Sequence, residues 1–443
     1  MSIPNHLQLD VPETDYPRIV IIGGGFAGLK LAKALKNVKA QVVMLDRNNF
    51  HTFQPLLYQV ATAGLEPDSI AGPLRKSFDG HFNYVFRMVK VTGVDFGEKK
   101  VQTKVGDLSY DYLVIANGSA TNYFGQEGLR EKVLPLKRIV HALDLRSHIL
   151  QIFEQAELTK DEAIFERMMN LVIVGGGPTG VEVAGALAEL RNHILPKDYP
   201  DLDFSKMNIH LVEGSGRLLN GMTDKSGNEA IHYLKRLGVD IRLNTVVQGY
   251  DDNIVNLGEE AIPSETVIWA AGVKGRILNG IDAKSIERSR ILVDEFNQVK
   301  GYDDVFAIGD VAMMQTENLP NGHPMLAPVA MQQGEHLAKN FKNLFNSKDL
   351  KPFKYLDKGS MATIGRNKAV VDMPGGIHFK GFFAWLVWMF IHIMYLIGFR
   401  NKLITLNNWI WSYLTYDKGT RLIIRTFSIA ARKKRLAEKA VTS

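Results

Sequence analysis

Leu171–Leu190 reads LVIVGGGPTGVEVAGALAEL, which is an apolar run, a glycine-rich turn and a segment with the spacing of a helix. A related segment, RIVIIGGGFAGLKLAKAL, occupies Arg18–Leu35. Both apolar runs are rich in β-branched residues, which is typical of buried parallel strands. The chain therefore carries the same strand–turn–helix unit twice.

The first turn has the pattern G-x-G-x-x-G, formed by Gly23, Gly25 and Gly28. The next apolar run, QVVMLD, ends in Asp46, which lies 23 residues after Gly23. Gly23 permits a tight turn, Gly25 lets the backbone approach a pyrophosphate, and Gly28 lets helix and strand pack closely. The helix N-terminus faces the phosphates, and the Asp46 carboxylate accepts a hydrogen bond from a ribose hydroxyl.

The second turn repeats this arrangement with Gly175, Gly177 and Gly180. Its following strand, NIHLVE, ends in Glu213. Because this carboxylate repels a 2′-phosphate, we expect the second site to favour NAD over NADP, although the nearby Arg217 acts in the opposite direction. Glycine turns also occur without a ligand, but here strand, helix and terminal acid accompany both. The sequence predicts an α/β protein with two Rossmann-like domains, which bind two dinucleotides and pass electrons between them.

Composition narrows the classes of site. The 443 residues include no cysteine, which excludes disulfides, thiolate metal sites, iron–sulfur clusters and cysteine nucleophiles. We expect no metal site. The net charge of +6 is uneven, since residues 400–443 contain ten Lys/Arg and two Asp/Glu. A basic C-terminal region predicts an anionic partner, either lipid or nucleic acid.

Three further segments resemble motifs of the two-dinucleotide-binding-domain flavoproteins: YDYLVIANGS (Tyr110–Ser119), SETVIWAAGV (Ser264–Val273) and YDDVFAIGD (Tyr302–Asp310). The resemblance implies FAD in the first domain and NADH in the second, with the second domain inserted into the first. The expected boundaries are 16–122 and 277–345 for the FAD domain, 123–276 for the NADH domain, and 346–443 for a C-terminal helical region that associates with a membrane.

Two more segments, NNFHTFQPLLYQVATAGL (Asn48–Leu65) and APVAMQQG (Ala327–Gly334), closely resemble type II NADH:quinone oxidoreductase. Disulfide reductases and sulfide:quinone oxidoreductases of the same superfamily need cysteines, which this chain lacks. The resemblance implies that hydride passes from NADH to FAD, and that two electrons then pass to a membrane quinone without proton pumping. A tethered redox sensor or scaffold with little turnover is the alternative.

The resemblance also implies roles for individual residues. Those expected to bind FAD are Gly23, Gly25, Phe26, Ala27, Gly28, Asp46, Arg47, Gln54, Val91, Ala116, Gly118 and Asp310. Those expected to bind NADH are Gly175, Gly177, Pro178, Thr179, Gly180, Glu213, Ala271 and Gly272.

Two residues are expected to act in catalysis. Glu182, just after the second turn, corresponds to a family glutamate near nicotinamide and flavin, unless it is only a charge at a helix N-terminus. Gln332 matches the second glutamine of the family's quinone-side motif, and Pro328 and Gln333 are also expected on the quinone side. Pro328 stands where the first glutamine is usual and offers no amide group. The alternative is that both glutamines are surface helix residues.

The C-terminal region contains 19 residues without formal charge, Gly381–Phe399, long enough to be considered as a membrane span. Its Trp and Tyr residues run through the middle rather than at the ends. Leu403–Tyr416 and Arg421–Arg435 have amphipathic spacing, the first with one polar face and the second with a basic face. We expect helices lying in the headgroup plane, and keep a single span, a buried core helix or a dimer contact as alternatives. His392 is expected to be a core residue without chemistry.

The expected partners are anionic membrane lipid and a membrane quinone. Nucleic acid is not expected, because Trp-rich amphipathic spacing suits lipid better. The expected location is the cytoplasmic face of the cell membrane, with peripheral or monotopic attachment, and the resemblance implies a homodimer.

Overall fold

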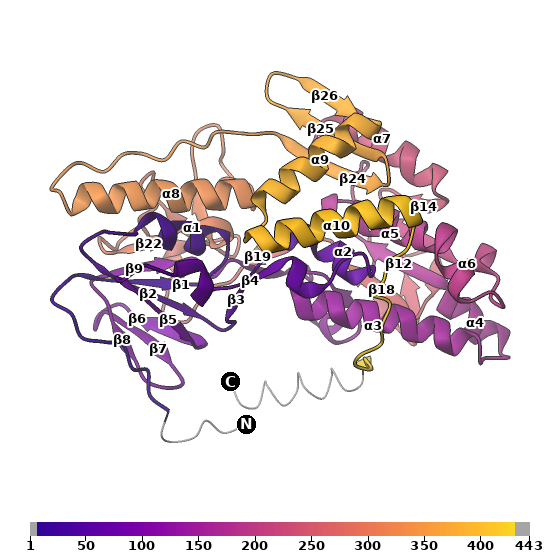
Figure 1. Cartoon of the computed structure of the whole chain (residues 1–443), viewed down its shortest axis with the longest axis horizontal. Coiled ribbons are helices and arrows are strands. Elements are labelled where there is room, and N and C mark those ends of the chain that lie inside the picture. The colour runs from indigo at the N-terminus through magenta and orange to yellow at the C-terminus, as the bar shows by residue number, and fades with distance from the viewer. Residues whose placement is uncertain (1–6, 430–443) are drawn as a thin grey trace. The chain divides into compact units, whose positions relative to one another are not determined.

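The computed structural model describes residues 7–429, and its chain divides into two compact units that each draw on several segments (Figure 1). The first unit comprises residues 1–52, 72–120 and 273–357, and the second comprises residues 53–71, 121–272 and 358–443. The region after residue 358 therefore groups with the nucleotide-binding residues of the second unit.

The first unit contains a five-stranded parallel sheet in the order β22-β9-β1-β2-β5. Its strands are β1 (Arg18–Ile22), β2 (Gln41–Asp46), β5 (Tyr84–Met88), β9 (Tyr112–Ile115) and β22 (Val305–Ala307). All five residues of β1 are buried, as the β-branched run RIVII predicts. The glycine turn at Gly23, which follows β1, and the late motif at Asp310, which follows β22, are both expected to meet FAD, and both come after strands of this sheet.

Two helices of the first unit pack closely on each other, α1 (Phe26–Ala34) and α8 (Ala327–Leu344). A Cβ on Gly334 would overlap the carbonyl oxygen of Ala27, so only glycine allows this approach. The other elements of this unit are β3 (Phe50–Thr52), η3 (Arg75–Phe78), β6 (Val91–Asp95), β7 (Lys100–Thr103), β8 (Leu108–Ser109), β19 (Val273–Gly275), η6 (Ala283–Ser285), β20 (Ile286–Glu287), β21 (Arg290–Val293), η7 (Gly309–Val311) and β23 (Ala312–Met314). Strands β4 (Ala71–Pro73) and β10 (Ser119–Thr121) lie where the chain passes between units.

The second unit repeats the parallel arrangement in the order β11-β18-β12-β13-β14. Its strands are β11 (Leu134–Pro135), β12 (Asn170–Val174), β13 (Asn208–Val212), β14 (Val239–Arg242) and β18 (Thr266–Trp269). The helices are α2 (Leu57–Ala61), α3 (Ile139–Ala156), α4 (Glu162–Met169), α5 (Pro178–His193), α6 (Leu195–Asp198) and α7 (Asp224–Arg236). The remaining elements are η1 (Gln54–Leu56), η2 (Pro67–Ser69), η4 (Glu127–Glu131), η5 (Phe204–Lys206), β15 (Gly249–Asp251), β16 (Ile254–Asn256) and β17 (Ala261–Pro263). The predicted fold class, with two Rossmann-like sheets, is confirmed.

The last part of the second unit is a three-stranded antiparallel sheet followed by two helices. These are β24 (Ser360–Gly365), β25 (Lys368–Met373), β26 (Ile377–Lys380), α9 (Gly381–Tyr395) and α10 (Phe399–Thr415). Strand β24 packs against α5, where a Cβ on Gly185 would overlap the carbonyl oxygen of Ile364. Among residues 7–429, no helix has the length and apolar character needed to cross a membrane.

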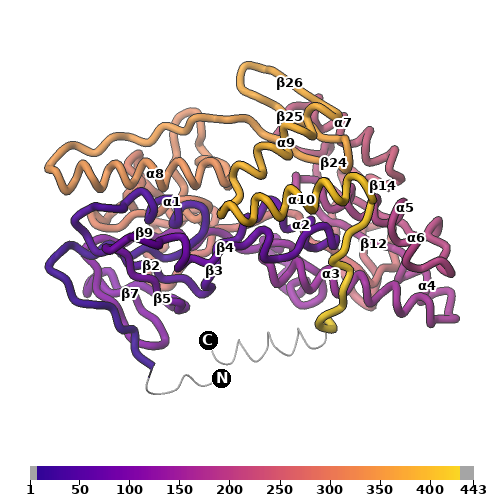
Figure 2. Tube along the Cα trace, in the orientation of Figure 1, coloured from indigo at the N-terminus to yellow at the C-terminus, as the bar shows by residue number. Residues whose placement is uncertain are grey.

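The prediction of a basic amphipathic helix over Arg421–Arg435 is wrong for residues 421–428, which have no helical structure. This segment runs along the second unit beyond α10 (Figure 2). Arg421 forms an ion pair of 2.5 Å with Asp198, and Arg425 pairs with Asp144. Both arginines thus pair with acidic residues of the second unit instead of forming one basic helix face. Arg432 and Arg435 lie outside the described residues.

Candidate active site

The glycine turn of the first unit has the geometry that a dinucleotide requires. Gly23 has φ of +110°, and a Cβ there would lie 2.5 Å from the carbonyl oxygen of Ala116. A Cβ on Gly28 would overlap the carbonyl oxygen of Gly23, whereas one on Gly25 would meet nothing within 4 Å. The turn is thus closed on its protein side and open at Gly25, where a pyrophosphate fits.

The Asp46 carboxylate stabilises the same turn from the end of β2. Its two oxygens accept backbone hydrogen bonds from Gly24 and Asn48, both at 2.7 Å. Each carboxylate oxygen keeps a further acceptor position, so ribose hydroxyls can also donate to it. The residues present therefore fit an adenosine ribose at this edge of the sheet.

The glycine turn of the second unit is nearly identical. Gly175 has φ of +111°, and a Cβ there would lie 2.5 Å from Cα of Ala271. A Cβ on Gly180 would overlap the Gly175 carbonyl oxygen, and one on Gly177 would meet nothing within 4 Å. Pro178 and Thr179 begin α5 directly after this turn. The second turn therefore offers the same cradle to a second pyrophosphate.

Glu213 takes the place of Asp46 in the second unit. Its carboxylate accepts backbone hydrogen bonds from Gly176 at 2.5 Å and Ser215 at 2.8 Å. Arg217, the nearby cation, forms an ion pair with Asp224. A 2′-phosphate would face the Glu213 charge and would have to compete for Arg217, and both effects favour NADH over NADPH.

The late motif of the first unit lies at η7. Ser119 donates its hydroxyl hydrogen bond to the Asp310 carboxylate, and the Gly309 amide donates to Oε1 of Gln333 at 2.8 Å. Gln333 is almost fully buried. Its side chain thus fixes the backbone that carries Asp310, a supporting position that the sequence alone does not reveal.

Other residues expected to bind FAD have diverse surroundings. The Phe26 ring meets the His51 ring edge-on with centroids 4.9 Å apart, and Arg47 is exposed. Gln54 belongs to the second unit, where its Oε1 accepts a 2.9 Å hydrogen bond from Lys137. Val91 packs against the core that includes Val94 and Val101, whereas Ala27 and Ala116 are buried and Gly118 is partly exposed.

The quinone-side motif occupies the first turns of α8. Pro328 lies at the start of the helix, where the proline ring suits the backbone and no intrahelical amide bond is lost. The Gln332 amide is paired with the backbone of Leu356, donating to its carbonyl at 2.9 Å and accepting from its amide at 3.0 Å. One N–H of Gln332 remains available to a quinone carbonyl.

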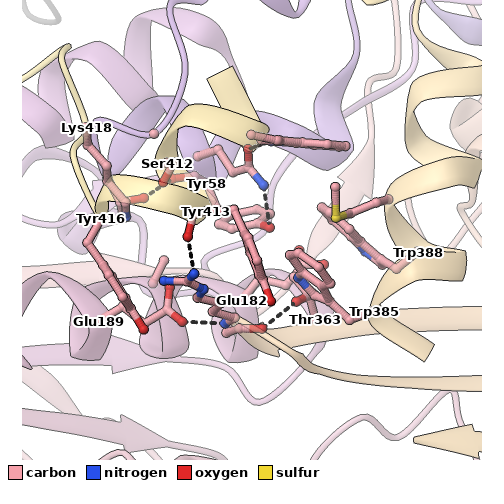
Figure 3. Close-up of a pocket in the computed structure, with 18 of the residues that line it drawn as sticks. Tyr58, Glu182, Glu189, Thr363, Trp385, Trp388, Ser412, Tyr413, Tyr416 and Lys418 are labelled. Atoms are coloured by element: carbon pink, nitrogen blue, oxygen red, sulfur yellow. Dashed lines mark hydrogen bonds between the residues drawn. The ribbon is translucent and has the colours of Figure 1, made fainter. Parts of the chain in front are cut away.

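Glu182 lies in a cavity of the second unit that is partly open to solvent (Figure 3). Its carboxyl group is buried and accepts a hydrogen bond from the Thr363 amide. Burial raises the pKa of Glu182 well above its ordinary value, and the Thr363 hydrogen bond offsets only part of this effect. Burial therefore favours the protonated form of the Glu182 carboxyl group.

Aromatic residues from α9 and α10 form one wall of this cavity (Figure 3). The Trp388 ring lies 5.6 Å from the Trp409 ring and 6.5 Å from the Tyr58 ring, centroid to centroid. Burial raises the pKa of Tyr58, and the nearby Glu182 contributes in the same direction. Burial thus favours the protonated forms of both Tyr58 and Glu182, which lie in a cavity that aromatic side chains partly line.

Charged groups occupy another part of the cavity wall. The Arg366 guanidinium lies 4.0 Å from the ring centroids of both Tyr413 and Tyr416. The Lys418 side chain faces the same cavity, and burial lowers its pKa while the negative charge of Glu189 acts in the opposite direction. These residues join the end of α10 to β24 and α5.

Sequence reasoning missed most of this wall. Arg366 and Lys418 stand in unremarkable polar segments, and their convergence depends on how β24 and the end of α10 fold. The helical spacing of Trp388 and His392 was a usable signal, because both are buried in the structure. His392 stacks on Trp388 at 4.1 Å, and burial lowers its pKa to about 4, consistent with a core position.

Helix α10 has its polar face turned inward. Thr405 is fully buried, Asn408 donates a 2.8 Å hydrogen bond to Glu66, and Trp409 donates to Gln59 at 2.7 Å. Most of its outward side chains are large and apolar, and so are those of α9, which lies beside it (Figure 1). The exposed large apolar residues of the two helices are Phe382, Phe383, Leu386, Phe390, Met394, Phe399, Leu403, Ile410, Trp411 and Leu414, and the polar residues Arg400, Asn407 and Thr415 of α10 are exposed among them. A contiguous apolar surface of this kind marks an interaction with membrane or protein.

Comparisons with known proteins identify the family. Residues 17–334 match the family model for pyridine nucleotide-disulphide oxidoreductases, and residues 358–416 match that of the NDH2 C-terminal domain. A type II NADH:quinone oxidoreductase of Mycobacterium tuberculosis is 36% identical, over 96% of this chain and 94% of the relative. The enzyme of that name from Staphylococcus saprophyticus is 28% identical, over 80% of this chain and 89% of the relative.

Solved structures show the same fold. NDH2 of Plasmodium falciparum, determined with NADH, has a TM-score of 0.83 at 22% identity and covers 93% of this chain and 100% of that one. A sulfide:quinone oxidoreductase from Aquifex aeolicus has a TM-score of 0.69 at 19% identity, over 90% of this chain and 95% of that one. Both likenesses show the shared fold. On the two glycine turns, the C-terminal domain and the identity along nearly the whole chain, this protein belongs to the type II NADH:quinone oxidoreductase family.

Proposed function

We propose that this chain oxidises NADH through bound FAD and reduces a membrane quinone while attached to a membrane surface. The observation that supports this most directly is the cavity that holds Glu182. Glu182 follows the second glycine turn by two residues, and the cavity wall includes α9 and α10, whose outer faces are apolar. Nucleotide chemistry and a membrane-facing surface thus share one unit.

Bound FAD supplies the carrier that accepts a hydride from NADH and returns two electrons to a quinone. The chain's contribution is to position these partners. Asp46 and the Gly23 turn hold one adenosine diphosphate group, and Asp310, fixed through Gly309 and Gln333, holds ribitol hydroxyls. Glu213 and the second turn hold NADH in the same manner.

Glu182 acts on the nicotinamide side. Burial raises the pKa of its carboxyl group and so favours the protonated form, which limits unpaired charge near the reacting ring. Gln332 acts on the quinone side through the N–H that Leu356 does not use. Pro328 contributes the start of α8 rather than a hydrogen bond.

Attachment uses the apolar faces of α9 and α10, which enter the headgroup region without crossing the bilayer. Lysines and arginines of the C-terminal region add attraction to anionic lipid. This arrangement corresponds to a peripheral or monotopic protein at the cytoplasmic face of the cell membrane. The family resemblance supports a homodimer.

Stopped-flow absorbance of the flavin band, recorded separately with NADH and with a soluble quinone, tests these roles. Gln332→Ala should slow reoxidation by quinone up to about tenfold, the value of one neutral hydrogen bond, and leave reduction by NADH nearly unchanged. Glu182→Ala should mainly slow the reduction of the flavin by NADH or the release of the nicotinamide. The reverse pattern would refute the two assignments, and a wild-type protein without turnover would favour the redox sensor.

A further inference from the structure

An exposed aromatic ring lies beyond the carboxyl ends of the strands in the sheet of the second unit. Phe124 belongs to the segment TNYFG (residues 121–125), and its side chain is 61% exposed. A Cβ built on Gly272 would lie 3.3 Å from Cζ of Phe124. The ring therefore lies directly against Gly272, just beyond the carboxyl end of β18.

Backbone contacts connect this ring to the glycine turn. A Cβ on Gly175 would lie 2.5 Å from Cα of Ala271, the residue before Gly272. Phe124, Gly272, Ala271 and Gly175 thus form a continuous row within the second unit. In the sheet order, β18 adjoins β12 on the side opposite to β13.

This order fixes the direction in which a dinucleotide lies. Glu213 at the end of β13 takes the adenosine ribose, and the turn after β12 takes the pyrophosphate. The other half of an extended dinucleotide must then cross toward β18, where Phe124 lies. Building on the proposed NADH site, we propose that Phe124 packs against the nicotinamide riboside half of NADH and positions it.

The backbone at Phe124 supports a ligand-binding role. Its φ is +51°, in the left-handed region that bulky side chains rarely adopt. Asn122 holds this conformation, because its Oδ1 accepts from the Phe124 amide at 2.9 Å and its carbonyl accepts from the Trp269 indole at 2.8 Å. An aromatic ring that is exposed, on strained backbone, contributes little to the stability of the free protein. A contact with NADH would explain why it is there.

The test compares equilibrium binding of NADH and of AMP, which lacks the nicotinamide riboside, to the full chain loaded with FAD that has been reduced beforehand, so that NADH is not oxidised during the measurement. Phe124→Ala should lower the affinity for NADH about three- to tenfold, the range of one aromatic contact, and leave the affinity for AMP unchanged. Val246→Ala is the matched control at the adenosine end of the site. Val246 is 60% exposed, and its Cγ2 lies 3.3 Å from a Cβ built on Gly214, the residue after Glu213. That variant should weaken both ligands, and Phe124→Tyr should restore NADH binding.

Thermal unfolding separates this role from a structural one. Phe124→Gly relieves the left-handed strain, so its melting temperature should equal or exceed that of the wild type while NADH binding weakens. A lower melting temperature, an equal loss of NADH and AMP, or unchanged NADH binding in Phe124→Ala would each overturn the proposal. A wild-type protein that binds neither NADH nor AMP would instead overturn the NADH site itself.

Discussion

The side-chain amide of Asn408 donates a 2.8 Å hydrogen bond to the carboxylate of Glu66, so the polar face of α10 is directed into the second unit. Thr405, one turn earlier, is fully buried on the same face. Helices on the surface of soluble proteins have the opposite orientation, with apolar groups inside. The inverted orientation is the physical reason to propose that the outer face contacts lipid.

Replacing apolar side chains on this face should weaken membrane attachment. Ile410 and Leu414 are 48% and 74% exposed, and each is worth up to about 1.5–3 kcal/mol when buried. The double variant Ile410→Ser, Leu414→Ser should therefore lower partitioning into anionic vesicles at least about tenfold in a flotation assay. Leu158→Ser, at a residue 82% exposed outside these helices, is the matched control. Equal flotation of both variants and the wild type would contradict lipid contact through α10.

Replacing Glu213 should change nucleotide choice. Glu213→Gln removes the charge that repels a 2′-phosphate and leaves one acceptor for the amides of Gly176 and Ser215. The ratio of kcat/KM for NADH over NADPH should fall, and kcat/KM for NADH should fall about tenfold or more, as expected for a lost charged hydrogen bond. Glu259→Gln, at an exposed acid, is the control. A wild-type preference for NADPH would show that the role given to Glu213 is wrong.

Replacing Asp310 should weaken flavin retention. Asp310→Ala removes an acceptor for ribitol hydroxyls and the partner of Ser119, while the Gly309–Gln333 hydrogen bond still holds the turn. Flavin affinity, measured by fluorescence of released FAD, should fall about tenfold or more. Asp303→Ala, in the same segment and exposed, should retain FAD. Full flavin content in both variants would remove Asp310 from the FAD site.

Acid should destabilise the protein through its buried histidines. Burial lowers the pKa of His392 from 6.5 to about 4, so the unfolded chain binds a proton between these values that the folded chain does not. The contribution of neutral His392 to the free energy of unfolding is fully present above pH 6.5. It is lost as pH falls toward 4, by roughly 3 kcal/mol. His392→Phe should flatten the pH dependence of the free energy of unfolding in this window, and exposed His232→Asn should not. An unchanged slope in His392→Phe would show that His392 titrates normally.

The parts that could be predicted from the sequence are those set by local rules. The turns at Gly23 and Gly175 follow from G-x-G-x-x-G between a buried run and a helical pattern, and the acids Asp46 and Glu213 follow from their strand ends. Such features need only a few neighbouring residues, so one sequence specifies them.

The parts that could not be predicted depend on distant segments. The Glu182 cavity needs β24 against α5 and α10 against residues 53–71, a convergence without a local signal. The arginine spacing of residues 421–435 predicted a helix, but Arg421 and Arg425 form ion pairs with acidic residues of α6 and α3. Helical periodicity cannot reveal which charges will be neutralised by tertiary contacts.

The most direct test of the central claim is NADH oxidation by the FAD-loaded protein bound to vesicles whose only acceptor is a long-chain quinone. We predict steady turnover until the quinone is consumed. The Ile410→Ser, Leu414→Ser variant should lose most of this rate and keep wild-type turnover with a water-soluble quinone analogue, because its active site is unchanged. A wild-type protein that oxidises only one equivalent of NADH, or a variant that reduces the vesicle quinone as fast as the wild type, would contradict the account.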